Sequence, residues 1–196
     1  MTTLRLVVLL SGGGRTMVNL AEAIAAGELD AEIALVLSSR KDAKGIERAR
    51  ELGLPVEVFR PRDHASREDF VAAQAARIRA AEPDLVIMAG YLLHFPVPEG
   101  FEGRMLNIHP SLLPAYGGQG MYGERVHAAV LAAGERESGC TVHVVDDVYD
   151  HGPVVLQTTV PVEPGDTVDS LAARVFEAEC RTYPAAIRQH AESLAD

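Results

Sequence analysis

The chain has 196 residues and a formal net charge of −10 at pH 7; 47% of its residues are hydrophobic and 23% are charged. These ordinary globular values argue against disorder and against a coiled coil, and they favour one domain over residues 1–196. No apolar run approaches the roughly 20 residues that a membrane-spanning helix needs, and the acidic balance disfavours nucleic acid as the main partner.

Short apolar runs alternate with helical stretches along the first half of the chain. The runs of strand length are residues 4–10, 33–37, 56–59, 84–88 and 104–109. The helical stretches are 17–26, 42–52 and the Ala-rich segment that Ser66 caps and Pro83 stops. Strands that alternate with helices predict an α/β fold with an open, mostly parallel, Rossmann-like sheet and helices on both faces.

The last third of the chain changes character. Two β-rich runs, 141–147 and 154–162, are separated by a turn signal at 149–153, which predicts an antiparallel β extension of the sheet. Residues 167–195 read as a helix, with a break or kink at Pro184 because proline removes a backbone hydrogen bond.

Ligands of open parallel sheets bind beyond the carboxyl ends of the strands, which directs attention to the loops there. The first loop, Ser11-Gly12-Gly13-Gly14-Arg15-Thr16, lies between a strand and a helix. Its glycines allow close backbone approach, and the free N–H groups of a helix N-terminus favour phosphate. The loop matches neither G-x-G-x-x-G nor a Walker motif, so a tight turn without a ligand stays an alternative.

Asn107 and His109 stand two residues apart at the carboxyl end of a predicted strand, so their side chains share a face. An amide donor beside an imidazole suits the stabilisation of an oxyanion and the movement of a proton. The plainer alternative is a pair of structural hydrogen-bonding residues.

The turn Asp146-Asp147-Val148-Tyr149-Asp150 carries three carboxylates. A solvated acidic loop is the default, and the spacing suits neither an EF-hand nor a zinc site. One of these carboxylates facing a catalytic histidine would raise the pKa of that histidine and fix its tautomer. The other histidines form no cluster in sequence and are interpreted as structural or exposed, so we expect no metal. Two cysteines without paired spacing indicate a reducing compartment, hence a cytoplasmic protein.

The string Asn107-Ile108-His109-Pro110-Ser111-Leu112-Leu113-Pro114, followed by Asp150-His151-Gly152-Pro153, resembles the folate-dependent formyltransferases. Similarity runs almost end to end, from Ser11-Gly12-Gly13-Gly14 to Tyr183-Pro184, and is greatest to members that formylate 5-phosphoribosylglycinamide. The resemblance implies a transferase of de novo purine (IMP) biosynthesis. The acceptor amine would attack the formyl group of the co-substrate 10-formyltetrahydrofolate directly, through a tetrahedral intermediate. The implied partners are these small molecules, and a homodimer is left open.

The resemblance also implies roles for individual residues. Asn107 would donate to the oxyanion, protonated His109 would stabilise it and act as an acid, and Asp150 would keep His109 charged. The residues implied to contact phosphoribosylglycinamide are Gly14, Arg15, Thr16 and Glu179. The residues implied to line the folate site are Arg67, Leu92, Leu93, His94, Phe95, Asn107, Asp146, Asp147, Val148, Tyr149 and Asp150. The Ser-Leu-Leu-Pro turn implies a cis peptide at Leu113–Pro114.

Three positions depart from the family pattern. Leu93 stands where a basic residue is usual, and His151 stands where a second glycine is usual. The segment 117–123 is longer than expected and carries four glycines, which indicates a mobile lid or a plain surface insertion. The competing functions are a sugar-nucleotide formyltransferase, a formyltetrahydrofolate hydrolase and, least favoured, a non-catalytic nucleotide- or folate-sensing module.

Overall fold

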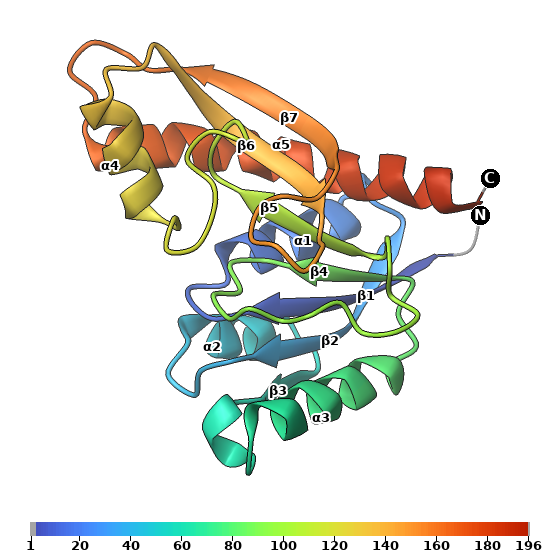
Figure 1. The fold of residues 1–196 in the computed structure, drawn as a ribbon. Coiled ribbons are helices and arrows are strands. Elements are labelled where there is room, and N and C mark those ends of the chain that lie inside the picture. Colours follow the sequence, from blue (N-terminus) through green and yellow to red (C-terminus); the bar gives the residue numbers. More distant parts are fainter. Residues whose placement is uncertain (1–2, 196) are drawn as a thin grey trace. The chain divides into compact units, whose positions relative to one another are not determined.

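The computed structural model describes residues 3–195 (Figure 1). Its strands are β1 (Leu4–Leu10), β2 (Ala31–Ser38), β3 (Val56–Val58), β4 (Leu85–Met88), β5 (Met105–His109), β6 (Glu137–Val144) and β7 (Val154–Pro161). Its helices are α1 (Arg15–Ala25), α2 (Lys44–Glu51), α3 (Arg67–Arg79), α4 (Glu124–Ala132) and α5 (Val168–Ala195), with a 3₁₀ helix η1 at Pro61–Asp63. The strand order is β3-β2-β1-β4-β5-β6-β7.

The chain divides into two compact units, Met1–Leu106 and Asn107–Asp196. In the first unit β1 pairs in parallel with β2 and β4, and β2 pairs in parallel with β3. The chain steps outward from β1 to β3 and then returns to the other side of β1. Right-handed crossovers therefore place α1 and α2 on one face of this part of the sheet and α3 on the opposite face. The predicted parallel α/β fold is confirmed.

The centre of the first unit is β1, whose residues Leu6 to Leu10 are fully buried. A continuous apolar strand of this kind is typical of a parallel sheet that is covered on both faces. At the start of α3 the Ser66 side chain accepts a hydrogen bond from the Asp69 backbone N–H at 3.0 Å, as the sequence predicts.

The second unit contains the antiparallel pair β6–β7, with Glu137 opposite Pro161 and His143 opposite Val154. Helix α5 packs against both of these strands. The predicted antiparallel extension is confirmed, and so is the cis peptide at Leu113–Pro114.

Two parts of the second unit differ from the sequence predictions. Of the break or kink expected at Pro184, the break does not occur: helix α5 continues through that residue, and its buried face, which includes Tyr183, Ala186 and Ile187, stays packed. Strand β6 ends at Val144 instead of reaching residue 147. Beyond it the Asp146 carboxylate accepts the Val148 backbone N–H at 2.9 Å, and such local bonds favour turns over strands.

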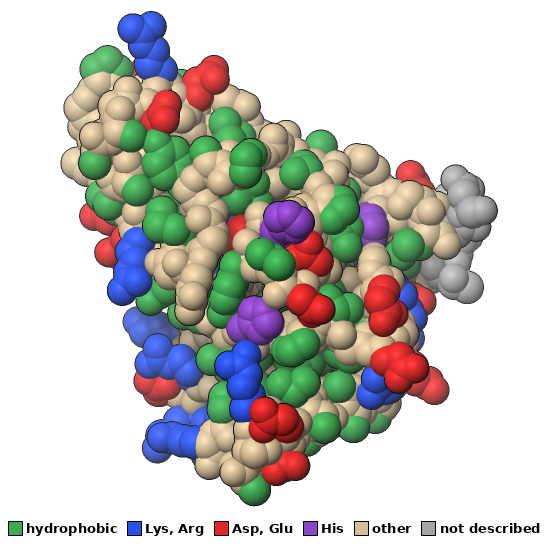
Figure 2. Space-filling view, in the orientation of Figure 1, with side chains coloured by type: hydrophobic (Ala, Val, Ile, Leu, Met, Phe, Trp, Pro, Cys, Tyr) green, Lys and Arg blue, Asp and Glu red, His purple; other side chains and the backbone are tan. Residues whose placement is uncertain are grey.

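The surface carries charges of both signs. Figure 2 shows one face of the molecule, on which hydrophobic, acidic and basic side chains are intermixed. Within residues 3–195, none of the helices is both long enough and apolar enough to cross a membrane.

Candidate functional site

The glycine loop of the first unit leads directly into α1. Gly14 is the residue before the helix and has φ of 71°, and a Cβ atom added there would lie 2.6 Å from Cα of Gly45. Only glycine fits this combination of backbone conformation and close approach. No side chain caps α1 and its first turn holds no acidic residue, so the helix N-terminus keeps the electrostatic character that favours an anion.

Neighbouring groups hold this loop in place. The Arg48 guanidinium donates to the Gly13 carbonyl at 2.7 Å. The Ser11 N–H donates to the Gly90 carbonyl at 3.0 Å, and the Ser11 hydroxyl accepts the Leu92 N–H at 2.9 Å. The loops that follow β1 and β4 are therefore bonded to each other at Ser11, at the carboxyl edge of the parallel strands where ligands bind.

The folate residues predicted within the first unit differ in their exposure. Leu92 is 44% exposed and Phe95 only 2%, so Phe95 belongs to the core. Arg67 donates to the His94 carbonyl at 3.2 Å, and the same nitrogen lies 3.3 Å from His94 Nδ1. Leu93 is half-buried beside them. The structure thus brings Arg67 and His94 together.

In the second unit the three predicted catalytic residues meet. His109 Nδ1 lies 3.4 Å from Asp150 Oδ2, and the Asn107 amide donates to Asp150 Oδ1 at 3.4 Å. The side chains of His109 and Asp150 are only 4% and 10% exposed. The strand that ends at His109 and the turn that holds Asp150 thus form a buried polar cluster around one carboxylate.

A fourth member of this cluster is His143, which the sequence alone predicts to be structural or exposed. Its Nδ1–H donates to the Val144 carbonyl at 3.0 Å, which leaves Nε2 as an acceptor for the Asn107 amide at 3.1 Å. His143 Nε2 also lies 3.7 Å from Asp150 Oδ1. The position of His143 on β6, beside β5 in the strand order, depends on strand pairing, which no local motif records.

Burial and charge act in opposite directions on these groups. The pKa of His109 is lowered from its ordinary value of 6.5, because burial disfavours the charged ring more than Asp150 favours it. This direction opposes the expectation of a His109 that is protonated at rest, while the effect of Asp150 has the predicted sign. Burial would raise the pKa of Asp150, but hydrogen bonding, which includes the Gly118 N–H, and the positive charge that His143 and His109 can carry outweigh burial and lower it, so the carboxylate is ionised at neutral pH.

The remaining predicted residues of the second unit lie at its surface. Val148 and Tyr149 are 58% and 38% exposed, and exposed apolar side chains of this size suit contact with an aromatic ligand. The Asp146 carboxylate accepts a hydrogen bond from His151 at 2.7 Å, so the unusual residue at 151 is bonded within the turn. Asp147 is exposed, and Glu179 is half-buried on α5.

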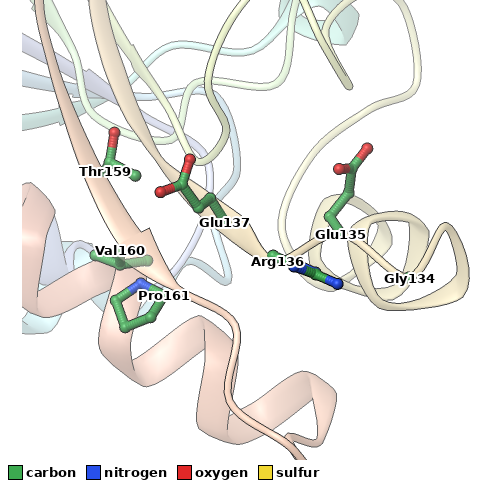
Figure 3. Close-up of a pocket in the computed structure, with 7 residues that line it drawn as sticks. All are labelled: Gly134, Glu135, Arg136, Glu137, Thr159, Val160 and Pro161. Atoms are coloured by element: carbon green, nitrogen blue, oxygen red, sulfur yellow. The ribbon is translucent and has the colours of Figure 1, made fainter.

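A surface cavity of about 690 Å³ lies elsewhere in the second unit, where the segment after α4 meets the end of β7 (Figure 3). Its lining consists of Gly134, Glu135, Arg136, Glu137, Thr159, Val160 and Pro161. None of the predicted catalytic residues lines this cavity. Among the described residues, no group of three or more His, Cys, Asp or Glu side chains is arranged to hold a metal ion.

Comparison with known proteins agrees with this fold. The family model described as formyl transferase matches residues 4–187, and the chain belongs to this family. It is 40% identical over 186 residues to the chloroplastic phosphoribosylglycinamide formyltransferase of Arabidopsis thaliana, covering 91% of the chain and 62% of that protein. It is 35% identical over 190 residues to phosphoribosylglycinamide formyltransferase of Haemophilus influenzae, covering 96% of the chain and 87% of that protein.

Among solved structures, the crystal structure of glycinamide ribonucleotide transformylase 1 from Symbiobacterium toebii is similar, with a TM-score of 0.91 and 41% identity. The alignment covers 98% of this chain and 89% of that one. The chain spans less than two thirds of the length of its plant relatives.

Proposed function

We propose that the protein transfers a formyl group from 10-formyltetrahydrofolate to the amine of 5-phosphoribosylglycinamide, a step of purine biosynthesis. The observation that carries the proposal is the buried cluster of Asn107, His109 and Asp150 on the fold of this family. The bacterial and plant relatives that bear the name phosphoribosylglycinamide formyltransferase support the choice of acceptor.

The proposed chemistry is a direct transfer. The acceptor amine forms a C–N bond to the formyl carbon and gives a tetrahedral oxyanion, and the bond from that carbon to N10 of the folate then breaks. The proton that the amine loses ends on N10. The Asn107 amide is the proposed donor to the oxyanion, since preorganised donors stabilise charge that develops in the transition state.

The His109–Asp150 pair is proposed to hold the proton while it is in transit. Neutral His109 can accept it at Nδ1, and ionised Asp150, 3.4 Å away, stabilises the imidazolium that forms. The resting ring therefore serves as a base first and as an acid afterwards. In this order of proton transfers His109 need not be charged at rest, and the same two residues, His109 and Asp150, take part.

The family resemblance also supports proposals for the residues that contact each substrate. The backbone of Gly14, Arg15 and Thr16 binds the phosphate of phosphoribosylglycinamide, and Glu179 contacts the same substrate. In a substrate complex, a phosphate lying more than about one residue length (~3.5 Å) outside that turn would overturn the assignment. The folate is bound by Arg67, the segment 92–95, Asn107 and the segment 146–150.

The test is incubation with 10-formyltetrahydrofolate, with and without phosphoribosylglycinamide, while free tetrahydrofolate and the formylated product are both measured. Formylated product in amounts equal to tetrahydrofolate supports the proposal. Release of formate regardless of acceptor indicates a hydrolase instead. If an amino-sugar nucleotide is offered as a second acceptor and only that acceptor is formylated, the protein is a sugar-nucleotide formyltransferase. No reaction with either acceptor contradicts enzymatic activity.

The cytoplasmic location and the homodimer also stay predictions. Fractionation of cells that produce the tagged protein tests the first, and sedimentation equilibrium across a range of protein concentrations tests the second.

A further inference from the structure

The turn between β5 and α4 touches both members of the catalytic pair. The Tyr116 carbonyl oxygen lies 2.8 Å from His109 Nε2, and the Gly118 N–H donates to Asp150 Oδ2 at 2.9 Å. A Cβ atom added to Gly117 would lie 2.6 Å from the Leu113 side chain and 3.2 Å from Asp150 Cβ. Backbone groups of three successive residues are thus fitted against the buried cluster.

The short contact at Tyr116 decides where the proton of neutral His109 resides. A lone pair on His109 Nε2 would be repelled by a lone pair of the Tyr116 carbonyl oxygen at 2.8 Å. Nε2 must therefore carry the hydrogen that this carbonyl accepts. Nδ1 is then the basic nitrogen, and it faces the Asp150 carboxylate across the longer distance of 3.4 Å. Asp150 is compensated by the Gly118 N–H and the Asn107 amide.

Tyr116 adopts a backbone conformation that is unfavourable for its side chain. Its φ is 58°, in the left-handed region that residues with a Cβ rarely occupy. Such conformations persist where surrounding contacts hold them, and they occur often at functional sites. Here the conformation turns the carbonyl oxygen toward His109.

The contact that holds Tyr116 from outside the turn is a hydrogen bond between its hydroxyl group and Glu135 Oε1, at 2.7 Å. The carboxylate raises the pKa of the Tyr116 phenol, mainly through this hydrogen bond. Glu135 lies in the segment that joins α4 to β6 and forms part of the wall of the cavity in Figure 3. The bond therefore ties the turn to the segment after α4.

We infer that Tyr116 is a positioning residue of the catalytic site: its hydroxyl group, held by Glu135, fixes the turn so that its carbonyl oxygen keeps the proton of His109 on Nε2. The inference rests on the proposed function, because it concerns the pair that moves the proton in formyl transfer. It assigns to Tyr116 and Glu135 no contact with either substrate.

The decisive measurement is nuclear magnetic resonance of the full-length protein with ¹⁵N-labelled histidine, because the two ring nitrogens report their protonation directly. The unchanged protein should carry the His109 proton on Nε2 at a pH above the His109 pKa. Tyr116→Phe and Glu135→Ala should each raise the share of the Nδ1–H tautomer. Both changes should also lower the pKa of His109, since the Tyr116 carbonyl favours the charged ring.

Kinetics with both substrates provide the second readout. Tyr116→Phe should lower kcat about three- to tenfold, the equivalent of one hydrogen bond, while KM for each substrate stays within about twofold. The acid limb of the rate profile should move to lower pH. Tyr116→Phe combined with Glu135→Ala should be no worse than either single change, because both remove the same bond.

Two control variants separate positioning from general effects. Glu135→Gln keeps an oxygen acceptor for the Tyr116 hydroxyl and should restore the tautomer and most of kcat. Glu137→Ala removes a carboxylate from the same cavity wall and should leave both readouts unchanged.

The inference is overturned if His109 carries its proton on Nδ1 in the unchanged protein. It is equally overturned if neither Tyr116→Phe nor Glu135→Ala shifts the tautomer, or if Glu137→Ala acts as strongly as Glu135→Ala. The spectra need no substrate, so the absence of formyl transfer would contradict the proposed function without deciding the tautomer.

Discussion

Asn107 Nδ2 donates a hydrogen bond to His143 Nε2 across 3.1 Å. The second hydrogen of the same amide points to Asp150 Oδ1 at the longer distance of 3.4 Å. Acceptors on both sides therefore fix the orientation of the amide, with its nitrogen toward the cluster. The weaker of the two bonds is the one that a developing oxyanion can replace, because the exchange leaves the bond to His143 intact.

Replacing Asn107 with alanine should lower kcat by about 10²–10³-fold if its amide is the oxyanion donor. KM for both substrates should change much less, because the bond forms in the transition state. Steady-state kinetics check this, with urea denaturation to verify that the variant is folded. A variant that loses affinity but keeps kcat would refute the assigned role.

A pH effect on stability is expected from two buried histidines. His127 is 4% exposed and its Nδ1 has no hydrogen-bond partner, and the pKa values of both His127 and His109 are lowered from 6.5, mainly by burial. The unfolded chain therefore binds more protons below that pH, so the free energy of unfolding should fall as the pH drops below 6.5. Asp150, whose ordinary value is 3.8, contributes only at lower pH.

The measurement is urea denaturation at about pH 7.5 and about pH 5.5, on either side of the ordinary histidine value. His127→Gln removes one of the two groups and should make the loss of stability on acidification smaller. If the variant loses as much stability as the unchanged protein, His127 is not responsible.

The parallel part of the fold could be predicted because its strands are buried on both faces. The run Leu4–Leu10 carries that pattern in its own residues. The beginning of β6 does not carry a strand pattern in its own residues, because Glu137, Ser138 and Gly139 are weak strand formers. Pairing with β7 decides the conformation there: a Cβ added to Gly139 would lie 2.1 Å from the Thr158 carbonyl, so the close approach of the two strands needs glycine.

The part of the candidate site that depends on local sequence patterns could be predicted. Alternation along a strand places Asn107 and His109 on one face, and the acidic turn supplies Asp150. The contribution of His143 depends on strand pairing, and the carbonyl of Tyr116 depends on a left-handed residue that no local preference predicts. The sign of the Asp150 effect on the His109 pKa follows from the sequence, but the net direction does not, because it is a balance between burial and charge and a sequence does not give the depth of burial.

Gly14 of the glycine loop can be compared with Gly27, which follows α1 and has a similar backbone conformation. Gly14→Ala meets both an unfavourable φ of 71° and the Gly45 backbone at 2.6 Å, whereas Gly27→Ala meets a φ of 73° and open space. Gly27→Ala should cost about 1–2 kcal/mol of unfolding free energy, and Gly14→Ala should cost more. Denaturation measures both, and only Gly14→Ala should raise KM for phosphoribosylglycinamide. Equal effects on KM would contradict the phosphate assignment of the loop.

The last prediction concerns the coupling of His109 to Asp150. Asp150→Asn removes the charge that favours the imidazolium, so the pKa of His109 should fall further below 6.5. Formyl transfer should slow, because the proton held on His109 loses its counter-charge, and KM for phosphoribosylglycinamide should change little. Histidine resonances give the pKa, and single-turnover kinetics give the transfer rate. Asp169→Asn, at an exposed carboxylate in the first turn of α5, is the control for the loss of one negative charge.

A double-mutant cycle then decides whether the two residues act as one unit. His109→Ala combined with Asp150→Asn should be far less damaging than the product of the two single losses, because a carboxylate that stabilises an imidazolium has no such role once the imidazole is gone. Their separation of 3.4 Å and their shared burial are the physical basis for this coupling. If the single losses multiply, the residues work independently, and the catalytic assignment of Asp150 has to be withdrawn.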